Sequence, residues 1–449
     1  MSTPTITTID PANGQKIESY PTHGPSEVER IFRRAANAFS EWRHEPIIDR
    51  AAKLKILADL LERDRTSLVS LMQQEMGKLA EEGAGEIDKC AACCRYYAES
   101  GPAFLETREI KTDAVKSYVA FEPIGTVLSI MPWNFPYWQA FRCLVPALLA
   151  GNTVVLKHAS NVSGCALKIA ELVEEAFERD DLFQVVLIPG KDALALVSRP
   201  EVSGVSFTGS TPVGREIAAL AGRELKKAVL ELGGSDAYVV LADADLEKAA
   251  KICANSRLLN AGQSCISAKR FIVEAAVYDR FEELFVAEMK GKKLAPLARE
   301  DLRDDLHEQV KNSVREGAKL LCGGELPKGE GNFYPPTVLS RVKPGMIAFD
   351  EETFGPVAAL IEAKDAAEAV HLANQTSFGL GAAVFTKDRA TGIEIAEKRL
   401  NAGSCFINAL VKSDPRLPFG GTKQSGYGRE LGEFGIHEFV NIKTVYLAE

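Results

Sequence analysis

The stretch GTVLSIMPWNFPYWQAFRCLVPALLAGNTVVL, residues 125–156, decides the fold class. It contains an apolar run at 126–130, a helical segment at about 137–150 and a second apolar run at 153–156. Short apolar runs that alternate with helices indicate parallel strands buried on both faces. The alternation continues through apolar runs at 185–188, 202–207, 228–232 and 237–241, with helical segments at about 163–178 and 211–222. The sequence therefore predicts an α/β chain with a doubly wound parallel sheet, whose ligands bind beyond the carboxyl ends of the strands.

Length and composition are typical of a globular protein with about three structural units. The chain has 449 residues, of which 46% are hydrophobic and 26% charged, and its formal net charge is −9. Because nucleic acids and anionic membranes need a basic face, no such partner is expected, and an anionic substrate needs a local cation. Residues 1–10 lack the pattern of a signal peptide, and the apolar run 143–150 is too short for a membrane span.

The cysteines suggest reduced thiols. The chain has nine cysteines without a spaced framework, which predicts a cytoplasmic protein. Cys90, Cys93 and Cys94 share one face of a predicted helix, so a zinc site and a packed apolar face are both open. Structural zinc sites need four ligands, and no second pair follows nearby, which favours the packed face and no metal.

A further cysteine ends the segment NAGQSC, residues 260–265. Glycine lets the backbone approach a ligand closely, and a thiolate is a strong nucleophile toward an electrophilic carbon. Cys265 is therefore a candidate nucleophile, with a buried inert thiol as the alternative. The histidine nearest in sequence is His307, so a Cys–His acyl-transfer site has no support.

Two polar residues lie at the ends of predicted strands, where ligands of such sheets bind. Asn134, in MPWNFP (131–136), offers an amide donor to a developing oxyanion, and turn chemistry is the alternative. Glu231 precedes two glycines and can take a proton from water, and an ion-paired surface carboxylate is the alternative. The strand-to-helix turn FTGSTPVG (207–214) can hold a pyrophosphate on backbone N–H groups, although it is neither a GxGxxG nor a Walker motif.

Seven motifs together resemble the NAD(P)-dependent aldehyde dehydrogenase superfamily. They are PWNFP (132–136), GNTVVLK (151–157), FTGSTPVG (207–214), ELGG (231–234), GQSC (262–265), EETFGPV (351–357) and PFGGTKQSG (418–426). The resemblance extends over residues 26–443, and it is greatest to the short succinate-semialdehyde dehydrogenases. It implies an aldehyde dehydrogenase-like fold and oxidation of an aldehyde with hydride transfer to NAD(P).

The resemblance implies roles for three residues in this chemistry. Cys265 corresponds to the nucleophile, Asn134 with the Cys265 backbone N–H to the oxyanion hole, and Glu231 to the base that activates the hydrolytic water. A thiohemiacetal and then a thioester replace one difficult step with two easier ones. The branch that passes the acyl group to coenzyme A typically lacks this glutamate, so Glu231 favours a carboxylic acid product.

The resemblance also implies a set of cofactor contacts. These are Trp133, Lys157, Ser160, Gly209, Ser210, Glu352 and Phe354. NAD-preferring members often carry glutamate at the position of Ser160, where its carboxylate would repel a 2′-phosphate, whereas serine can bond to that phosphate. NADP is therefore expected to be preferred, with NAD as the other cofactor. The alternative is that Ser160 only caps the following helix.

The substrate is predicted from Arg142, which falls where succinate-semialdehyde dehydrogenases bind the distal carboxylate. A guanidinium pairs with a carboxylate in a bidentate manner, and Ser413 and Arg416 are further candidate contacts. The sequence departs from longer members at Leu259, where they have a second arginine, and at Cys143, where they have lysine. Other ω-oxo acids and simple aldehydes therefore stay open, as does an exposed Arg142 at a helix end.

The predicted architecture has three parts. A dinucleotide-binding domain comprises 1–104 and 125–231, a catalytic domain comprises 232–429, and an oligomerisation element joins 105–124 to 430–449. The strand-like segments 111–121 and 440–447 lie in the last part, where an unpaired edge would seek a second chain, so a homodimer or homotetramer is expected. The alternatives are an aldehyde dehydrogenase of broad specificity and, more distantly, a non-enzymatic scaffold.

Overall fold

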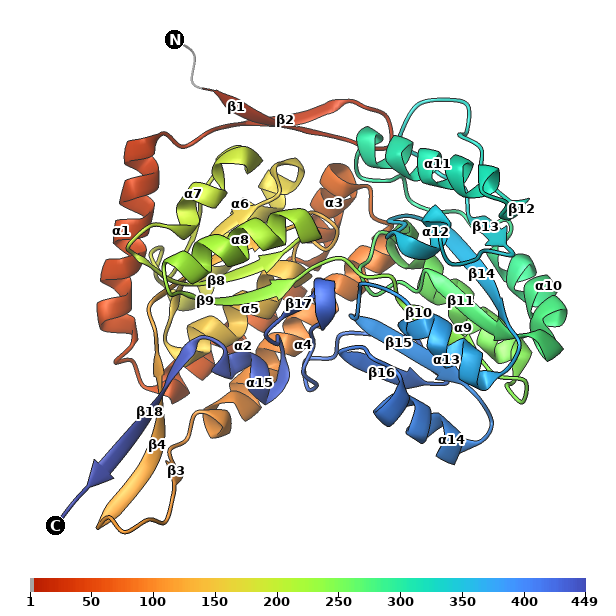
Figure 1. Cartoon of the computed structure of the whole chain (residues 1–449). Coiled ribbons are helices and arrows are strands. Elements are labelled where there is room, and N and C mark those ends of the chain that lie inside the picture. The colour runs from red at the N-terminus through yellow and green to blue at the C-terminus, as the bar shows by residue number, and fades with distance from the viewer. Residues whose placement is uncertain (1–3) are drawn as a thin grey trace.

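The computed structural model describes residues 4–449, and one of its two large sheets contains the stretch 125–156 (Figure 1). This six-stranded sheet has the order β17-β9-β8-β5-β6-β7. Its strands are β5 (Thr126–Met131), β6 (Thr153–His158), β7 (Phe183–Val185), β8 (Val202–Thr208), β9 (Lys227–Glu231) and β17 (Gly426–Tyr427). Neighbouring strands are parallel except for β17, which pairs antiparallel with β9. The predicted doubly wound α/β sheet is thereby confirmed.

Helices cover both faces of this sheet because side chains alternate along each strand. Val127 of β5 packs into one apolar core, and Leu128 packs into another on the opposite face. The Val127 core includes α2 (Ile47–Arg63), α3 (Arg65–Met76), α4 (Ala80–Phe104), α5 (Trp138–Ala150) and α6 (Ser163–Phe177). The Leu128 core includes α1 (Pro25–Trp42), α7 (Leu194–Val197) and α8 (Thr211–Arg223). All six residues of β5 are consequently buried.

The second large sheet has seven strands in the order β12-β13-β14-β11-β10-β15-β16. They are β10 (Ala237–Val240), β11 (Arg270–Glu274), β12 (Lys319–Cys322), β13 (Thr337–Ser340), β14 (Val357–Ala363), β15 (Gly381–Phe385) and β16 (Ser404–Ile407). The helices of this half are α9 (Leu246–Leu258), α10 (Tyr278–Met289), α11 (Glu300–Arg315), α12 (Ile347–Asp350), α13 (Ala366–Asn374) and α14 (Arg389–Glu394). Tyr238 and Phe271 of this sheet belong to the same apolar core as Val127, so one core connects the two sheets.

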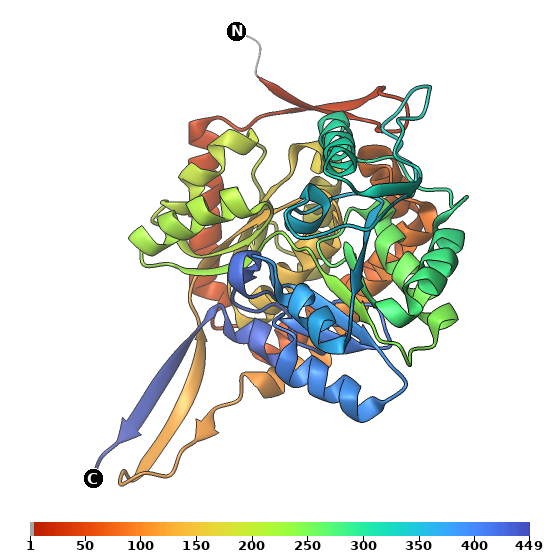
Figure 2. The same ribbon diagram turned by 45° about the vertical axis from the view of Figure 1, so that its right-hand side comes forward.

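A small sheet projects from the body of the molecule in both views (Figures 1 and 2). It contains β3 (Arg108–Glu109), β4 (Lys116–Pro123) and the C-terminal β18 (Val440–Leu447), which follows the short α15 (Gly432–His437). β18 pairs antiparallel with β4 along its whole length. The remaining hairpin, β1 (Thr5–Ile9) with β2 (Lys16–Pro21), lies near the N-terminus.

Two predicted strands differ from the structure in their bounds. The run 185–188 was expected to be a strand, but β7 ends at Val185. Beyond it, the Leu187 backbone exchanges hydrogen bonds with His23 rather than continuing the sheet, since the His23 N–H donates to the Leu187 carbonyl at 2.8 Å. The run 111–121 begins as a strand only at Lys116, after a turn. Within residues 4–449, no helix combines the length and apolarity that a bilayer crossing requires.

Candidate active site

Cys265 lies in the connection between α9 and β11, and its backbone takes an unusual course. Asn260, Ala261 and Gly262 all have positive φ angles, of 55°, 52° and 75°. At Gly262 a Cβ atom would lie 2.3 Å from the carbonyl carbon of Gly355, so only glycine fits there. The Asn260 side chain donates to the Asn134 carbonyl at 2.8 Å and to the Gln263 carbonyl at 3.1 Å. The loop before Cys265 is thus tied to the turn that carries Asn134.

The side chain of Asn134 is held by the same loop. Its Nδ2 donates to the Gln263 carbonyl at 3.1 Å, and its Oδ1 accepts from Gln139 Nε2 at 3.2 Å. An amide nitrogen carries two hydrogens, so one remains for a further acceptor. Asn134 and Cys265 line one cavity, and the structure therefore brings these two predicted residues together.

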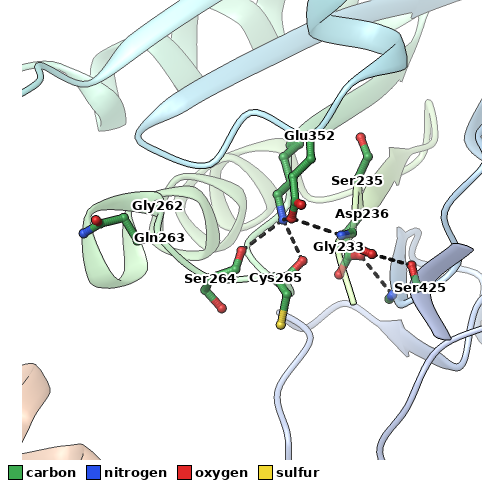
Figure 3. Close-up of polar contacts among 12 residues, drawn as sticks. Gly233, Ser235, Asp236, Gly262, Gln263, Ser264, Cys265, Glu352 and Ser425 are labelled. Carbon is green, nitrogen blue, oxygen red and sulfur yellow. Dashed lines mark hydrogen bonds and ion pairs between the residues drawn. The ribbon is translucent and has the colours of Figure 1, made fainter. Parts of the chain in front are cut away.

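Cys265 is half-buried where two cavities meet, and it lines both. In Figure 3 its sulfur points away from its own carbonyl oxygen and from Glu352. Burial above all, with a smaller effect of Glu231 and Glu352, raises the pKa of the thiol to about 12, although Arg142 and Lys269 act in the opposite direction. These surroundings favour the neutral thiol.

Lys269, which the sequence analysis missed, holds the backbone of the Cys265 loop. Its buried ammonium donates to the carbonyls of Ser264 at 3.0 Å and of Cys265 at 2.6 Å. It also pairs with Glu352 Oε1 at 3.4 Å. A lysine next to Arg270, immediately before an apolar run, was the available sequence signal, because charges there must be compensated when buried.

Glu352 lies beside the glycine pair that follows β9 (Figure 3). Its Oε1 accepts from the Gly234 N–H at 3.0 Å. A Cβ at Gly233 would lie 2.5 Å from Glu352 Oε2, so glycine allows this close approach. Ser425 Oγ donates to the Gly233 carbonyl at 2.6 Å and fixes the turn from the other side.

The first cavity has walls that suit a dinucleotide. It encloses about 740 Å³, including its open mouth. Seven of the predicted residues line it, namely Trp133, Asn134, Gly209, Ser210, Cys265, Glu352 and Phe354. The Trp133 and Phe354 rings meet edge to face with centroids 5.9 Å apart. Helix α8 begins beside Ser210 without a side-chain cap; Pro212 has no N–H and the Gly214 N–H donates to the Ser210 carbonyl at 2.9 Å, so the N–H groups of Thr211 and Val213 remain for a phosphate group.

Lys157 lies in β6 and Ser160 in the turn that follows this strand, and neither residue lines one of the two cavities. Burial lowers the pKa of the Lys157 ammonium to about 8. Ser160 is half-buried in a short helical turn, and no side-chain hydrogen bond caps that turn or helix α6. The alternative that Ser160 serves as a helix cap is therefore wrong.

Glu231 ends β9 in a fully enclosed position. Neither of its carboxyl oxygens has a hydrogen-bond partner, and Oε1 lies 2.8 Å from the place of a Cβ at Gly420. Burial, and secondarily the neighbouring Glu430, raises its pKa well above the usual range. The alternative of an ion-paired surface carboxylate is wrong, but the carboxyl group lines neither cavity in this structure.

The second cavity encloses about 870 Å³, including its mouth, on the other side of Cys265. Arg142 and Ser413, both predicted substrate contacts, line it. Arg142 is only 2% exposed, so an exposed helix end is excluded, and its Nε pairs with Glu430 Oε2 at 2.8 Å. Leu259 lines the cavity as well.

Arg416 does not join this group. Its side chain is 72% exposed and pairs with Asp414 at 2.7 Å, outside the cavity. The prediction that Arg416 contacts the substrate is wrong for this structure, because the loop that carries Ser413 into the cavity turns Arg416 toward solvent. Lys89 and Trp138 line the cavity instead, and the sequence analysis did not single them out.

The cysteine cluster on α4 has a packing role. Cys90, Cys93 and Cys94 are completely buried in the core that connects the two sheets. Within residues 4–449, no group of three or more histidine, cysteine, aspartate or glutamate side chains is arranged to hold a metal ion. All nine cysteines are free thiols.

Known proteins of the same architecture match this chain over nearly its whole length. Residues 1–445 match the aldehyde dehydrogenase family. The chain is 44% identical to the succinate semialdehyde dehydrogenase (NAD(P)+) Sad of Escherichia coli, covering 98% of this chain and 97% of the relative. It is 42% identical to a succinate-semialdehyde dehydrogenase (NADP(+)) of Mycobacterium avium, covering 98% and 96%.

The solved structures agree with these relatives. The succinic semialdehyde dehydrogenase of Streptococcus pyogenes in complex with NADP+ superposes with a TM-score of 0.96 at 36% identity, covering 99% of this chain and 100% of that chain. The motifs, the two cavities that meet at Cys265 and these likenesses have one explanation. The chain belongs to the aldehyde dehydrogenase family.

Proposed function

We propose that the protein oxidises succinate semialdehyde to succinate, with NADP as the preferred hydride acceptor and NAD as the other. The observation that carries this proposal is the position of Cys265 where two cavities meet. One cavity has the aromatic walls and helix N-terminus that suit a dinucleotide, and the other contains cationic side chains. The names of the E. coli, M. avium and S. pyogenes relatives support the same substrate and cofactor.

In the proposed reaction, Cys265 Sγ gives its proton to solvent water and bonds to the aldehyde carbon, whose oxygen takes the electron pair of the carbonyl π bond. The oxygen of the resulting thiohemiacetal accepts hydrogen bonds from Asn134 Nδ2 and the Cys265 backbone N–H, which stabilise its negative charge. A bound nicotinamide dinucleotide supplies the acceptor for the hydride. Glu231 then takes a proton from water, which attacks the Cys265 thioester and releases the carboxylic acid. This step requires the Glu231 carboxyl to turn toward Cys265 and to be deprotonated.

The cofactor preference rests on Ser160 and Lys157. No carboxylate stands at residue 160 to repel a 2′-phosphate, and the Lys157 ammonium precedes it by three residues. A phosphate dianion favours a charged lysine, which would offset the effect of burial on Lys157.

An aldehyde dehydrogenase of broad specificity is the second candidate. Apolar side chains make up much of the second cavity, and Leu259 stands where longer succinate-semialdehyde dehydrogenases have an arginine. These features suit an uncharged aldehyde. Butanal, which matches succinate semialdehyde in chain length but lacks the carboxylate, discriminates between the two candidates.

The test measures kcat/KM for succinate semialdehyde and butanal with NADP and with NAD. We expect the highest value for succinate semialdehyde with NADP. Ser160→Glu is expected to lower kcat/KM for NADP about tenfold or more, because a carboxylate repels the 2′-phosphate, whereas Ser160→Gln controls for side-chain size. Equal values for the two aldehydes would contradict the substrate, and a preference of the wild type for NAD would contradict the cofactor.

We also propose that the domain division 1–104 with 125–231, 232–429, and 105–124 with 430–449 describes this chain. The two large sheets support it, with the difference that β17 of the second part joins the first sheet. The free cysteines support a cytoplasmic location. A homodimer or homotetramer is proposed from the small projecting sheet.

A further inference from the structure

The second cavity contains a cation that has no counterion. Lys89 of α4 lines it together with Arg142, Trp138 and Ser413. The Arg142 guanidinium already pairs with Glu430 at 2.8 Å. Within residues 4–449, no aspartate or glutamate forms an ion pair with Lys89, whose ammonium donates to Ser413 Oγ at 2.7 Å and lies 4.2 Å from the centre of the Trp138 ring. The two cations therefore differ in how far their charge is compensated.

Within residues 4–449, the two acidic groups that line this cavity, Glu82 and Glu86, form no ion pair with Lys89. Glu86 Oε1 accepts from the backbone N–H groups of Tyr137 at 2.8 Å and Trp138 at 3.0 Å, and its Oε2 accepts from Lys78. Glu82 Oε1 accepts from the Asn260 N–H at 2.6 Å, whereas its Oε2 has no hydrogen-bond partner within residues 4–449, and burial raises the pKa of this carboxyl. Since neither of these carboxyl groups forms an ion pair with Lys89 in the part of the chain that the structure describes, the Lys89 ammonium stays available to a carboxylate that enters the cavity.

Ser413 has a hydroxyl hydrogen that its neighbours leave free. Its Oγ accepts from Lys89 Nζ at 2.7 Å and from Trp138 Nε1 at 3.1 Å. An ammonium and an indole N–H can only donate, so the Ser413 oxygen is the acceptor in both bonds. Its own hydrogen must therefore point to a third group. An ammonium and a hydroxyl donor held side by side are complementary to the two oxygens of a carboxylate.

We propose that Lys89, with the Ser413 hydroxyl, binds the distal carboxylate of the aldehyde substrate. This inference rests on the proposed function and names the specificity-determining residue of the same site. Longer succinate-semialdehyde dehydrogenases have an arginine at the position of Leu259. In this chain Lys89 supplies the unpaired positive charge instead, while Arg142 remains bound to Glu430. A four-carbon ω-oxo acid places its aldehyde at Cys265 and its carboxylate at Lys89.

The Lys89 side chain changes its charge in a pH range that an activity assay can cover. Burial, and next Arg142 of α5, lower its pKa to about 8, against the opposing effect of Cys90, Cys93 and Glu86 of its own helix. In the free protein the ammonium is therefore lost as the pH rises through about 8. The preference for a carboxylated aldehyde should decline over the same range.

The experiment compares the ratio of kcat/KM for succinate semialdehyde to kcat/KM for butanal. We expect Lys89→Met to lower this ratio about tenfold or more, because a charge-assisted hydrogen bond is lost, and Lys89→Arg to restore part of it. Arg416→Met is the matched control, since it removes a cation outside the cavity and should leave the ratio unchanged. In the wild type the ratio should fall above pH 8, and in Lys89→Met this dependence should be absent.

Binding of succinate gives a readout that does not depend on turnover. Succinate should raise the Tm of the wild type and of Lys89→Arg, but not that of Lys89→Met. A wild type without preference for succinate semialdehyde would overturn the proposed function and this inference with it. A wild-type preference that Lys89→Met retains, with the same pH dependence and Tm shift, would overturn the role of Lys89 alone.

Discussion

Cys265 and Glu231 both lie in surroundings that favour their neutral forms. Burial raises the pKa of the Cys265 thiol to about 12 and that of the Glu231 carboxyl well above its usual range. Both groups need to lose a proton in the proposed reaction. The pKa values of Cys265 and Glu231 must therefore fall when charged groups of the cofactor and substrate enter the site. The two acids also raise each other's pKa when charged, since their negative charges repel.

Replacing Glu231 separates the two halves of the reaction. Glu231→Gln should preserve a rapid burst of reduced cofactor and lower the steady-state rate roughly 100-fold or more, because the hydrolytic water loses its base. Stopped-flow absorbance resolves the burst from the steady state. Cys265→Ala is the control and should lose both phases. An unchanged steady-state rate in Glu231→Gln would remove this residue from the role of base.

At the scale of elements, the turn between β5 and α5 is held by the neighbouring strand β6. His158 at the end of β6 accepts from the Ala159 N–H at Nδ1, at 2.9 Å, which leaves Nε2 to donate to the Pro136 carbonyl at 2.8 Å. This arrangement needs the neutral ring with its proton on Nε2. Burial lowers the pKa of His158 from 6.5 to about 4. The strand thus fixes the Asn134 turn through an imidazole that stays uncharged at neutral pH.

The pKa of His158 predicts how stability changes with acid. The folded-state pKa of His158 lies below the unfolded value of 6.5. The contribution of the neutral His158 ring to the free energy of unfolding is therefore complete above pH 6.5, and it is lost as the pH falls through about 4. The loss amounts to about 3 kcal/mol. His158→Gln keeps a donor for Pro136 but does not titrate. Its Tm, measured against that of the wild type from pH 7.5 to pH 4, should approach the wild-type value as the pH falls. A constant difference would contradict the role of His158.

At the scale of the whole molecule, the projecting sheet is the feature that a second copy would cover. β18 pairs with β4 on one side only, and Ile442 and Tyr446 on one of its faces are 60% and 53% exposed. An edge strand with exposed apolar side chains favours pairing with another chain. The structure therefore supports the proposed homo-oligomer through this sheet.

Charges on that face should disrupt the assembly. The double variant Ile442→Asp with Tyr446→Asp is expected to have the mass of a monomer by light scattering, because two carboxylates cannot be buried against a second copy without partners. Asn441→Asp places an acidic group on the opposite face of β18 and serves as the control. An assembly of unchanged mass in the double variant would place the interface elsewhere.

The sequence by itself determined the doubly wound sheet and the family, and it singled out Asn134 and Cys265, which line one cavity, whereas the role of Glu231 stays a prediction. Hydrophobic alternation and short motifs are local, so they can be read without knowing which segments meet. The bounds of 185–188 were wrong because His23, distant in sequence, takes the hydrogen bonds of Leu187.

Only the tertiary structure decided how the charges of the second cavity are compensated. Arg142 pairs with Glu430 from near the C-terminus, whereas Lys89 of α4 donates to Ser413 and pairs with no carboxylate among residues 4–449. Arg416, three residues after Ser413, turns to solvent. Electrostatic interactions depend on distance and burial in space, so the spacing of residues along the chain cannot show which cation remains free for a ligand.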